Sequence, residues 1–436
     1  MNSNRIIVEK IVNGGYGLAR KTDGQVVLLR NCLPGEEVDY SILEKRKNIL
    51  FGVTNNIFQS NIHRVEPPCQ YYTTCGGCNL QHGSYEEQLH IKKSILSELL
   101  QHNSHICGTV IPSPMEFGYR QRIRLQVKDG LPGFLQFRSK TLVPVKKCLL
   151  AHPAINNTFA ATRQQLSFQK ICSSAREIEY LFNPITEKVS LLFHLHRKPR
   201  PADKQSAQQL TDDVGQVERV FFTGDTFSLE GPYCRAEASL KDNLLAQRFD
   251  FQEDNSSFVL SWEVGGFCQV NILQNHNLIS YVLRQCQETL GKNILDLFCG
   301  MGNFSIPLAK SAKSILGAEG QGAAIRCANR NSSSAGLNNT RFIKGDITHV
   351  CKTLMTENRR FDITVIDPPR QGVPNLAGTI ASLTRGKIIY ISCDPATLAR
   401  DLGDLKRNGF TTTHIQPFDM FPQTHHIETV AVLEKN

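Results

Sequence analysis

The sequence lacks the features that direct a chain to or across a membrane. No uninterrupted apolar stretch approaches the roughly 20 residues that span a bilayer, which predicts a chain that does not cross one. The first residues scatter charge through short apolar runs, without the apolar segment and small-residue cleavage site of a signal peptide. We therefore expect a cytoplasmic protein. An internal repeat and a low-complexity tract are also absent.

What the sequence has is length and a moderate excess of positive charge. Its 436 residues predict two or three domains, and Lys and Arg outnumber Asp and Glu by 49 to 40. A basic segment between Ser113 and Cys148 suits a polyanionic partner such as nucleic acid, with a solvated sheet face as the alternative. Its basic residues are Arg120, Arg122, Arg124, Lys128, Arg138, Lys140, Lys146 and Lys147.

Cysteine is the other abundant reactive residue, with 14 in the chain. Without an export signal, these thiols are expected to pack, bind metal or react rather than form disulfides. Four of them form a candidate metal site, because Cys69, Cys75 and Cys78 lie close together and Cys148 follows two lysines. Four thiolates suit zinc or an iron–sulfur cluster. A single C-x-x-C pair joined by two separate cysteines favours the iron–sulfur cluster.

The N-terminal third contains a β module and then a helix. Residues 1–60 alternate short apolar strands with Asn-Gly-Gly and Asp-Gly turns, which predicts a small OB-like β-barrel of the kind often used on oligonucleotides. Residues 61–105 hold three of the four cysteines and a predicted helix. That helix follows a capping box formed by Ser84 and Glu87.

The remainder divides into two further regions. Residues 106–265 contain alternating runs such as RIRLQV and predict a central antiparallel β domain with few helices, in which Pro199, Pro201 and Asp203 mark a loop. In residues 266–436 short apolar strands alternate with helical segments, which predicts an α/β fold with a doubly wound, mostly parallel sheet. The last two strands lack an intervening helix, so we expect an antiparallel hairpin at the sheet edge.

The strand ends of this α/β region carry a candidate cofactor site. The first strand ends in DLFCGMGN (296–303), whose glycines would let the backbone approach a ligand. Glu319, Asp346 and Asp367 end the next three strands and could accept hydrogen bonds from ribose hydroxyls or an adenine amino group. S-adenosylmethionine fits better than NAD, because the loop lacks the third glycine of G-x-G-x-x-G. A structural glycine turn is the remaining alternative.

Two further strand ends suit chemistry on a pyrimidine. Arg370 follows Asp367-Pro-Pro where an amino-methylating enzyme typically has an aromatic residue, and Cys393 ends the next strand. A thiolate that adds to C6 makes C5 nucleophilic, and a base must then remove the C5 proton. Glu428 in the terminal hairpin is the candidate base. Each residue alone is more often structural, but together with the cofactor acids they favour an enzyme.

The chain resembles the bacterial RNA uracil-C5 methyltransferases along nearly its whole length. The resemblance is carried by Leu33-Pro34-Gly35-Glu36, the four cysteines and the motifs FCQVN, DLFCGMGNFS, DPPRQG, IIYISCDPATLARDL and DMFPQTHHIE. It implies a TRAM domain of OB-like type, a four-cysteine 4Fe–4S site, a central β domain and a Rossmann-like domain that binds S-adenosylmethionine. It also implies methylation of one uracil in 23S rRNA. We expect that uracil to be flipped out of a single-stranded or loop region, where RNA bases are recognised, and we expect a monomer.

The resemblance also implies roles for individual residues. Cys393 would be the nucleophile and Glu428 the proton acceptor. The implied cofactor contacts are Gln269, Phe298, Asn303, Glu319, Asp346 and Asp367, and the implied cluster ligands are Cys69, Cys75, Cys78 and Cys148. Two alternatives stay open: a tRNA uracil as the substrate, or an iron–sulfur RNA-binding or redox-sensing factor with a vestigial pocket.

One departure from the family pattern lies next to the nucleophile. The family usually has Asn after the cysteine, whereas this chain has Asp394. A carboxylate beside a thiol should raise the thiol pKa unless its charge is paired or turned away. We expect the chemistry to survive this change.

Overall fold

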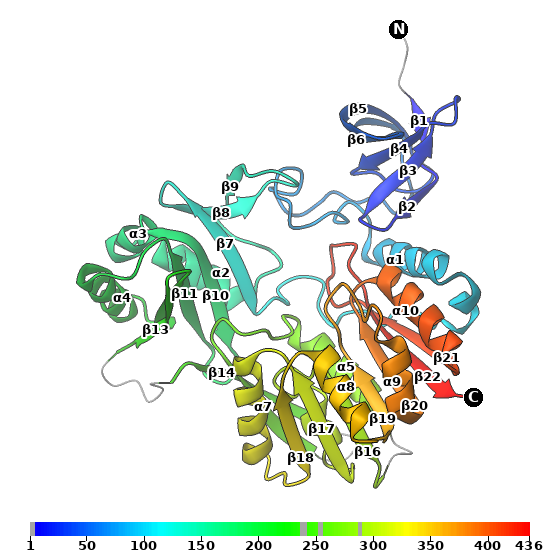
Figure 1. Cartoon of the computed structure of the whole chain (residues 1–436). Helices are drawn as coiled ribbons and strands as arrows, with labels where there is room; N and C mark the ends of the chain where they lie inside the picture. Colours follow the sequence, from blue (N-terminus) through cyan, green and yellow to red (C-terminus); the bar gives the residue numbers. More distant parts are fainter. Residues whose placement is uncertain (1–4, 236–241, 252–255, 287–289) are drawn as a thin grey trace.

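The structure is a computed structural model that describes residues 5–235, 242–251, 256–286 and 290–436. Three large sheets follow one another along the chain, and the cysteine-rich segment and a helix separate the first from the second (Figure 1). Among these described residues, no helix is long and apolar enough to cross a membrane.

The N-terminal sheet has six strands in the order β1-β5-β6-β4-β3-β2. Alternate residues such as Val27, Leu29 and Val38 are fully buried and form a small core of their own. Gly14 and Gly15 adopt positive φ in the turn between β2 and β3, where a side chain would be strained. The strands are β1 (Ile6–Ile7), β2 (Lys10–Val12), β3 (Tyr16–Arg20), β4 (Val26–Arg30), β5 (Glu37–Arg46) and β6 (Ile49–Gln59).

A single helix follows the cysteine-rich segment. Helix α1 (Tyr85–Leu100) begins where the sequence predicts, because the Ser84 side chain accepts a hydrogen bond from the Glu87 backbone N–H at 3.3 Å. A short 3₁₀ helix, η1 (Gln101–Ile106), ends it. Leu96 and Leu100 belong to the core of the C-terminal sheet, while Ile91 and Ile95 pack with Ile11 of β2, so α1 joins the C-terminal and N-terminal sheets.

The central sheet has seven strands in the order β13-β12-β11-β10-β7-β8-β9. Its strands are β7 (Arg122–Lys128), β8 (Leu131–Leu135), β9 (Leu142–Pro144), β10 (Ala175–Asn183), β11 (Lys188–Leu195), β12 (Val217–Gly224) and β13 (Phe227–Tyr233). Helices α2 (Pro153–Thr162) and α3 (Leu166–Cys172) lie between β9 and β10. A separate hairpin of β14 (Leu244–Phe251) and β15 (Ser256–Glu263) leads toward the last sheet.

Two expectations for this region are wrong. The segment marked as a loop is helix α4 (Pro201–Asp213), in which Pro201 occupies the first turn and the Asp203 carboxylate accepts the Arg200 backbone N–H. A proline is tolerated there, because the first-turn N–H groups have no partner within the helix. Strands β11 and β12 are consequently parallel rather than antiparallel, since α4 returns the chain to the same end of the sheet.

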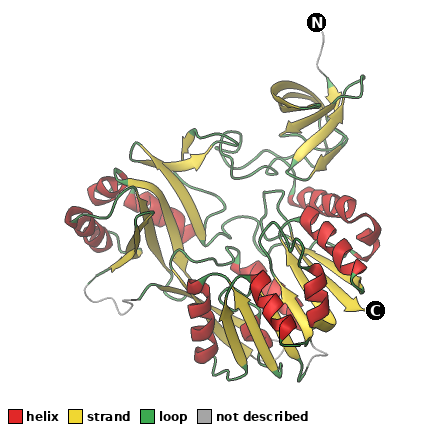
Figure 2. Cartoon of the chain, viewed as in Figure 1, coloured by secondary structure: helices red, strands yellow, loops and turns green. Residues whose placement is uncertain are grey.

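The C-terminal sheet has the order β18-β17-β16-β19-β20-β22-β21, with helices against both faces (Figure 2). All its neighbours are parallel except β22, which is antiparallel to β20 and β21 and so confirms the predicted hairpin. The strands are β16 (Asn293–Leu297), β17 (Ser314–Glu319), β18 (Thr340–Lys344), β19 (Phe361–Ile366), β20 (Thr384–Ser392), β21 (Phe410–Phe418) and β22 (Glu428–Lys435). The helices are α5 (Ile272–Gln285), α6 (Ser305–Leu308), α7 (Gly322–Ser334), α8 (Ile347–Thr356), α9 (Ala377–Leu383) and α10 (Pro395–Arg407).

The strand order determines where a ligand can bind. From β16 the chain builds outward in one direction through β17 and β18, and then in the other through β19 and β20. The loops after β16 and β19 therefore diverge and leave a crevice at the carboxyl ends of these strands.

Candidate active site

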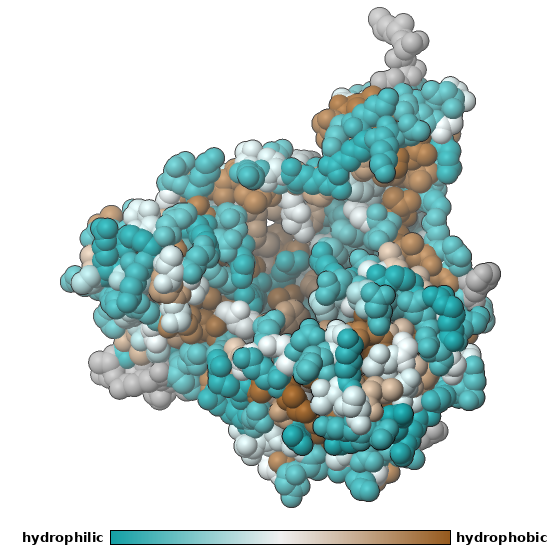
Figure 3. Space-filling model, in the orientation of Figure 1, coloured by the Kyte–Doolittle hydropathy of each residue, from teal (hydrophilic) through white to brown (hydrophobic). Residues whose placement is uncertain are grey.

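A cavity of about 670 Å³ occupies this crevice and extends toward the central sheet. A hollow is visible between the three sheets in the space-filling view (Figure 3). Seven of the eight residues predicted for cofactor binding and catalysis line the cavity. They are Gln269, Phe298, Asn303, Glu319, Asp367, Cys393 and Glu428.

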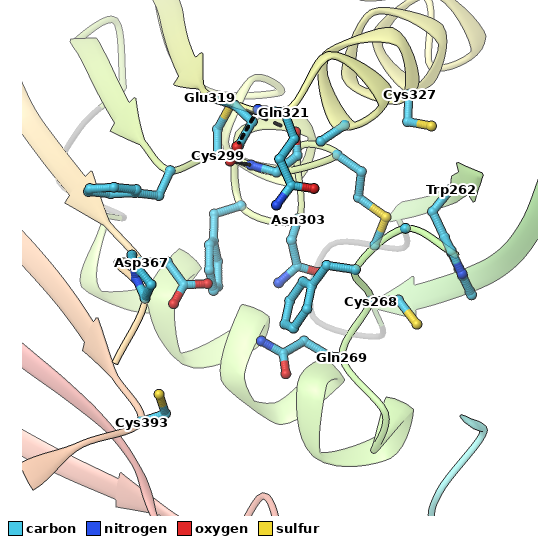
Figure 4. Close-up of a pocket in the computed structure, with 18 of the residues that line it drawn as sticks. Trp262, Cys268, Gln269, Cys299, Asn303, Glu319, Gln321, Cys327, Asp367 and Cys393 are labelled. Carbon is cyan, nitrogen blue, oxygen red and sulfur yellow. Dashed lines mark hydrogen bonds between the residues drawn. The ribbon is translucent and has the colours of Figure 1, made fainter. Parts of the chain in front are cut away.

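The loop after β16 is held open by backbone conformation and by Glu319. Phe298, Gly300 and Gly302 all have positive φ, and a Cβ on Gly302 would lie 2.8 Å from a side-chain carbon of Ile306. The Glu319 carboxylate accepts the Gly300 backbone N–H at 3.2 Å and the Gln321 backbone N–H at 2.8 Å (Figure 4). The second strand end thus fixes the loop of the first and presents its carboxylate to the cavity.

Amide side chains also line the cavity. Asn303 and Asn275 exchange two amide hydrogen bonds at 2.9 and 3.1 Å, which fixes the Asn303 side chain at the cavity surface. Gln269 reaches the cavity from the segment before α5 (Figure 4). Sequence reasoning from spacing alone did not identify Gln269 or Phe298, because neither follows a recognisable pattern.

Three carboxyl groups lie at this end of the sheet, of which Asp296 and Glu428 are buried and Asp367 is half-buried. The pKa of Asp367 is raised to about 7 by burial and then by the charges of Asp296 and Glu319. The pKa of Asp296 is also raised to about 7, chiefly by burial. Burial and then Asp367 raise the pKa of Glu428 well above its ordinary value. A bound cation would relieve this repulsion, and S-adenosylmethionine carries a positive sulfonium.

Cys393 lies immediately after β20, and its sulfur points toward the side of the cavity that holds Asp367 (Figure 4). The pKa of its thiol is raised to about 11, chiefly by burial and then by the charges of Glu428 and Asp367, while Arg370 opposes the shift. The thiol is therefore protonated at neutral pH in the cofactor-free protein. Loss of negative charge nearby would favour the thiolate.

Asp394 does not disturb this thiol. Its carboxylate accepts the backbone N–H groups of Ala396 at 3.0 Å and Thr397 at 2.9 Å, so it caps helix α10. A charge in this position is stabilised by the helix N-terminus. Glu428 and Asp367, and not the adjacent Asp394, are the carboxyl groups that raise the Cys393 pKa.

Asp346 is the predicted residue that the cavity does not include. It follows β18, and its side chain caps α8 by accepting the His349 backbone N–H at 3.0 Å. Its helix-capping pattern, an Asp directly before a helix, was visible in the sequence and gives the carboxylate a structural task.

A second cavity, of about 380 Å³, is lined by all four predicted metal-ligating cysteines. Burial raises the pKa of Cys78 to about 12 and also raises the pKa values of Cys75 and Cys148, with smaller contributions from the other thiols. Within the described part of the chain, no group of three or more His, Cys, Asp or Glu side chains is arranged to hold a single metal ion.

The basic segment differs from its expected arrangement. Arg122 and Arg124 both pair with the buried Glu179, so they stabilise the central sheet instead of presenting free charge. Arg120 lines both cavities and lies over the rings of Tyr119 and Phe421. The exposed basic residues that remain are Lys128, Arg138, Lys140, Lys146 and Lys147.

Comparison with known proteins places the chain in a family. The family model described as tRNA (uracil-5-)-methyltransferase matches residues 84–436. The chain belongs to this family. It is therefore an S-adenosylmethionine-dependent RNA uracil-C5 methyltransferase.

Individual relatives extend the match to the N-terminal region. The 23S rRNA (uracil(1939)-C(5))-methyltransferase RlmD of Pseudomonas aeruginosa is 31% identical over 441 residues, covering 99% of this chain and 94% of that protein. An uncharacterized RNA methyltransferase of Aquifex aeolicus is 32% identical, with 99% and 98% coverage.

A solved structure shares the fold. The Pyrococcus abyssi tRNA (uracil-54, C5)-methyltransferase, in complex with S-adenosyl-L-homocysteine, matches with a TM-score of 0.74 and 24% identity, covering 98% of this chain and 100% of that one.

Proposed function

We propose that this enzyme methylates C5 of one uracil in 23S rRNA, at the position equivalent to 1939. The full-length similarity to RlmD, 31% over 99% of the chain, supports this substrate. The N-terminal sheet and the four-cysteine segment do not separate a ribosomal from a tRNA substrate, because the Pyrococcus abyssi tRNA enzyme matches 98% of this chain, so the substrate proposal rests on the similarity to RlmD.

Placement of Cys393 and Glu428 in one cavity with the cofactor-facing carboxylates is the observation that supports the mechanism. The Cys393 thiol first loses its proton to water, and the thiolate then adds to C6 of uracil, which places negative charge on C5 and O4. C5 then attacks the methyl carbon of the sulfonium, the bond from that carbon to sulfur breaks, and neutral S-adenosylhomocysteine leaves. Glu428 removes the C5 proton, the C5–C6 double bond re-forms, and the thiolate is expelled.

We assign the cofactor to the part of the cavity lined by Gln269, Phe298, Asn303, Glu319 and Asp367. Glu319 would accept the ribose hydroxyls, and Asp367 would face the positive sulfonium side of the cofactor. A contact from Asp346 requires its helix-capping carboxylate to turn, so we expect the smallest loss of affinity from Asp346→Asn.

The cysteine cavity fits a 4Fe–4S cluster by its donor set. Cys69, Cys75, Cys78 and Cys148 are free thiols around one space. Burial raises the pKa values of Cys75, Cys78 and Cys148, and a bound metal would favour their ionised forms. The cluster would stabilise this irregular segment, since methyl transfer needs no electron. Iron and sulfide content of anaerobically purified protein, wild type against Cys75→Ala, tests this assignment.

RNA would reach the cavity as a flipped base from a loop, because the uracil edge is inaccessible in a duplex. An aromatic and arginine cluster between the N-terminal and central sheets offers stacking surfaces beside this route, with the Arg138 guanidinium 5.4 Å from the ring centroids of Tyr16, Phe51 and Phe137. We expect the Arg138→Ala variant to bind RNA more weakly, with a reduced dependence on salt.

The deciding experiment is mass spectrometry of 23S rRNA fragments from cells that lack the gene. We expect one 5-methyluridine to disappear, and to return with the wild-type gene but not with Cys393→Ala. If every methyluridine of 23S rRNA persists, the ribosomal assignment is wrong and tRNA is the next substrate to measure.

A further inference from the structure

The loop between β21 and β22 leads directly into Glu428, the proposed base. We call residues 419–427 the tip loop. Its first half is held by hydrogen bonds from other elements. Lys92 donates to Asp419 and Gln88 to Gln423. Asn271 donates to the Met420 carbonyl and Tyr119 to the Pro422 carbonyl. These contacts end at Gln423, five residues before the base.

Asn79 is the tether that reaches closer to Glu428. Its side-chain oxygen accepts the His425 backbone N–H at 3.0 Å, and its amide nitrogen lies 2.8 Å from His425 Nδ1. An amide nitrogen can only donate, so Nδ1 is the acceptor and the imidazole is neutral. Burial accordingly lowers the pKa of His425 to about 4. The Asn79 side chain thus fixes both the backbone and the ring of His425.

The same residue joins two other parts of the molecule. Asn79 follows the cluster cysteine Cys78 in the chain, and its amide also donates to the Gly14 carbonyl of the N-terminal sheet at 3.2 Å. The fit is tight, because a Cβ on Gly15 would lie 2.2 Å from the Asn79 amide nitrogen. The Asn79 and Leu80 backbone N–H groups both donate to the Gln423 carbonyl at 3.1 Å.

We propose that Asn79 is a positioning residue for the methyl-transfer reaction, through which the four-cysteine segment and the N-terminal sheet hold Glu428 in place. This inference rests on the proposed role of Glu428. Asn79 holds His425, which is three residues from Glu428, and is itself anchored to the four-cysteine segment and the N-terminal sheet. This contact limits Glu428 to one geometry. Displacement of a reacting group by about 1 Å can slow a reaction about 100-fold.

The reaction order gives this role a distinctive signature. Glu428 acts only after the Cys393 adduct has formed and the methyl group has transferred. A displaced base should therefore slow the release of the adduct and leave its formation intact. The protein–RNA covalent complex should then accumulate with ordinary uridine as substrate.

The test compares Asn79→Ala with Asn61→Ala in the full-length protein. Asn61 is a matched control because its side chain is also half-buried and makes the same two kinds of hydrogen bond. It donates to the Pro34 carbonyl at 2.9 Å and accepts the His63 backbone N–H at 2.7 Å. For Asn79→Ala we expect kcat to fall about tenfold with KM for RNA and for S-adenosylmethionine unchanged within twofold, and more covalent complex on denaturing gels. Asn61→Ala should match the wild type in all three.

Each outcome decides the proposal. Unchanged kcat and adduct in Asn79→Ala would refute it, and so would a parallel loss of iron, melting temperature and RNA affinity, which indicates a structural role alone. If Asn79→Ala does not fold, His425→Ala removes the ring contact from the other side and must show the same signature. Glu428→Gln distinguishes a failure of the positioning role of Asn79 from a failure of the proposed base. If this variant turns over normally, Glu428 is not the base.

Discussion

The two cavities of this protein differ in how the chain supplies their ionisable groups. The methyl-transfer cavity takes its proposed catalytic and cofactor-binding carboxylates and its catalytic thiol from the strand ends of one sheet. The cysteine cavity takes three of its thiols from an irregular segment and the fourth from the connection after β9. A sheet edge holds its side chains without a ligand, whereas loop-borne ligands depend on the group they bind. Arg120 lines both cavities.

The largest expected effect comes from removing the nucleophile. Cys393→Ala should reduce methyl transfer on the order of 10³-fold or more, because covalent activation of C5 is lost. RNA affinity and S-adenosylmethionine affinity should be retained, since the sheet keeps its shape. Transfer of a radiolabelled methyl group, measured beside gel-shift binding, gives both quantities.

Cys107→Ala is the matched control for that variant. Cys107 is also half-buried, and it lies outside the residues that line either cavity. If Cys393→Ala remained active while Cys107→Ala was inactive, the nucleophile would have been assigned to the wrong strand end.

A smaller effect should follow from pH. The sulfonium favours ionised carboxylates, and the pKa of Asp367 is about 7 in the free protein, so binding must release a proton. Affinity for S-adenosylmethionine should therefore weaken about tenfold between pH 8 and pH 6 if one such proton is released. Calorimetry in buffers of different ionisation enthalpy measures the proton release directly.

The Asp367 carboxyl should affect folding stability in the opposite direction to cofactor affinity as the pH rises. Its folded pKa lies above the ordinary value near 3.9, so the folded state binds the extra proton. The resulting stabilisation is present at low pH and is lost as the pH rises through about 7. Asp367→Asn should thus raise the melting temperature of the cofactor-free protein at pH 8 while weakening cofactor binding. A lower melting temperature at pH 8 would contradict the assigned charge repulsion.

Removing ligands from the cysteine cavity should slow turnover only severalfold. Replacing Cys75 and Cys78 with Ala removes two proposed cluster ligands, and we expect iron to be lost and the segment around Asn79 to become susceptible to proteolysis. Affinity for S-adenosylmethionine should stay within twofold, because that part of the site is built on the sheet. An equal loss of cofactor affinity would show that the two cavities are not independent.

The same contrast explains what could be predicted from the sequence. Strand-end motifs placed Glu319, Asp367 and Cys393 at one cavity, because parallel strands bring their carboxyl ends to one edge. Glu428 reaches the same edge because it begins the antiparallel strand β22 beside β20. The pairing of Arg122 and Arg124 with Glu179 could not be foreseen, since it joins strands more than 50 residues apart. The helix at Pro201 differs from the predicted loop because proline is common both in loops and in the first turn of a helix, and Asp203 two residues later indicates the helix start.

The smallest expected effect concerns the residue beside the nucleophile. Asp394→Asn should leave methyl transfer within about twofold of the wild type, because Asn and Asp cap helices almost equally well. Asp394→Ala should lose about 1 kcal/mol of folding stability, since the Ala396 and Thr397 backbone N–H groups lose their acceptor. Melting curves and single-turnover rates of both variants separate capping from catalysis. If Asp394→Asn were folded but inactive, this carboxylate would act on the thiol or the RNA directly, and its orientation toward the helix would not describe the reacting enzyme.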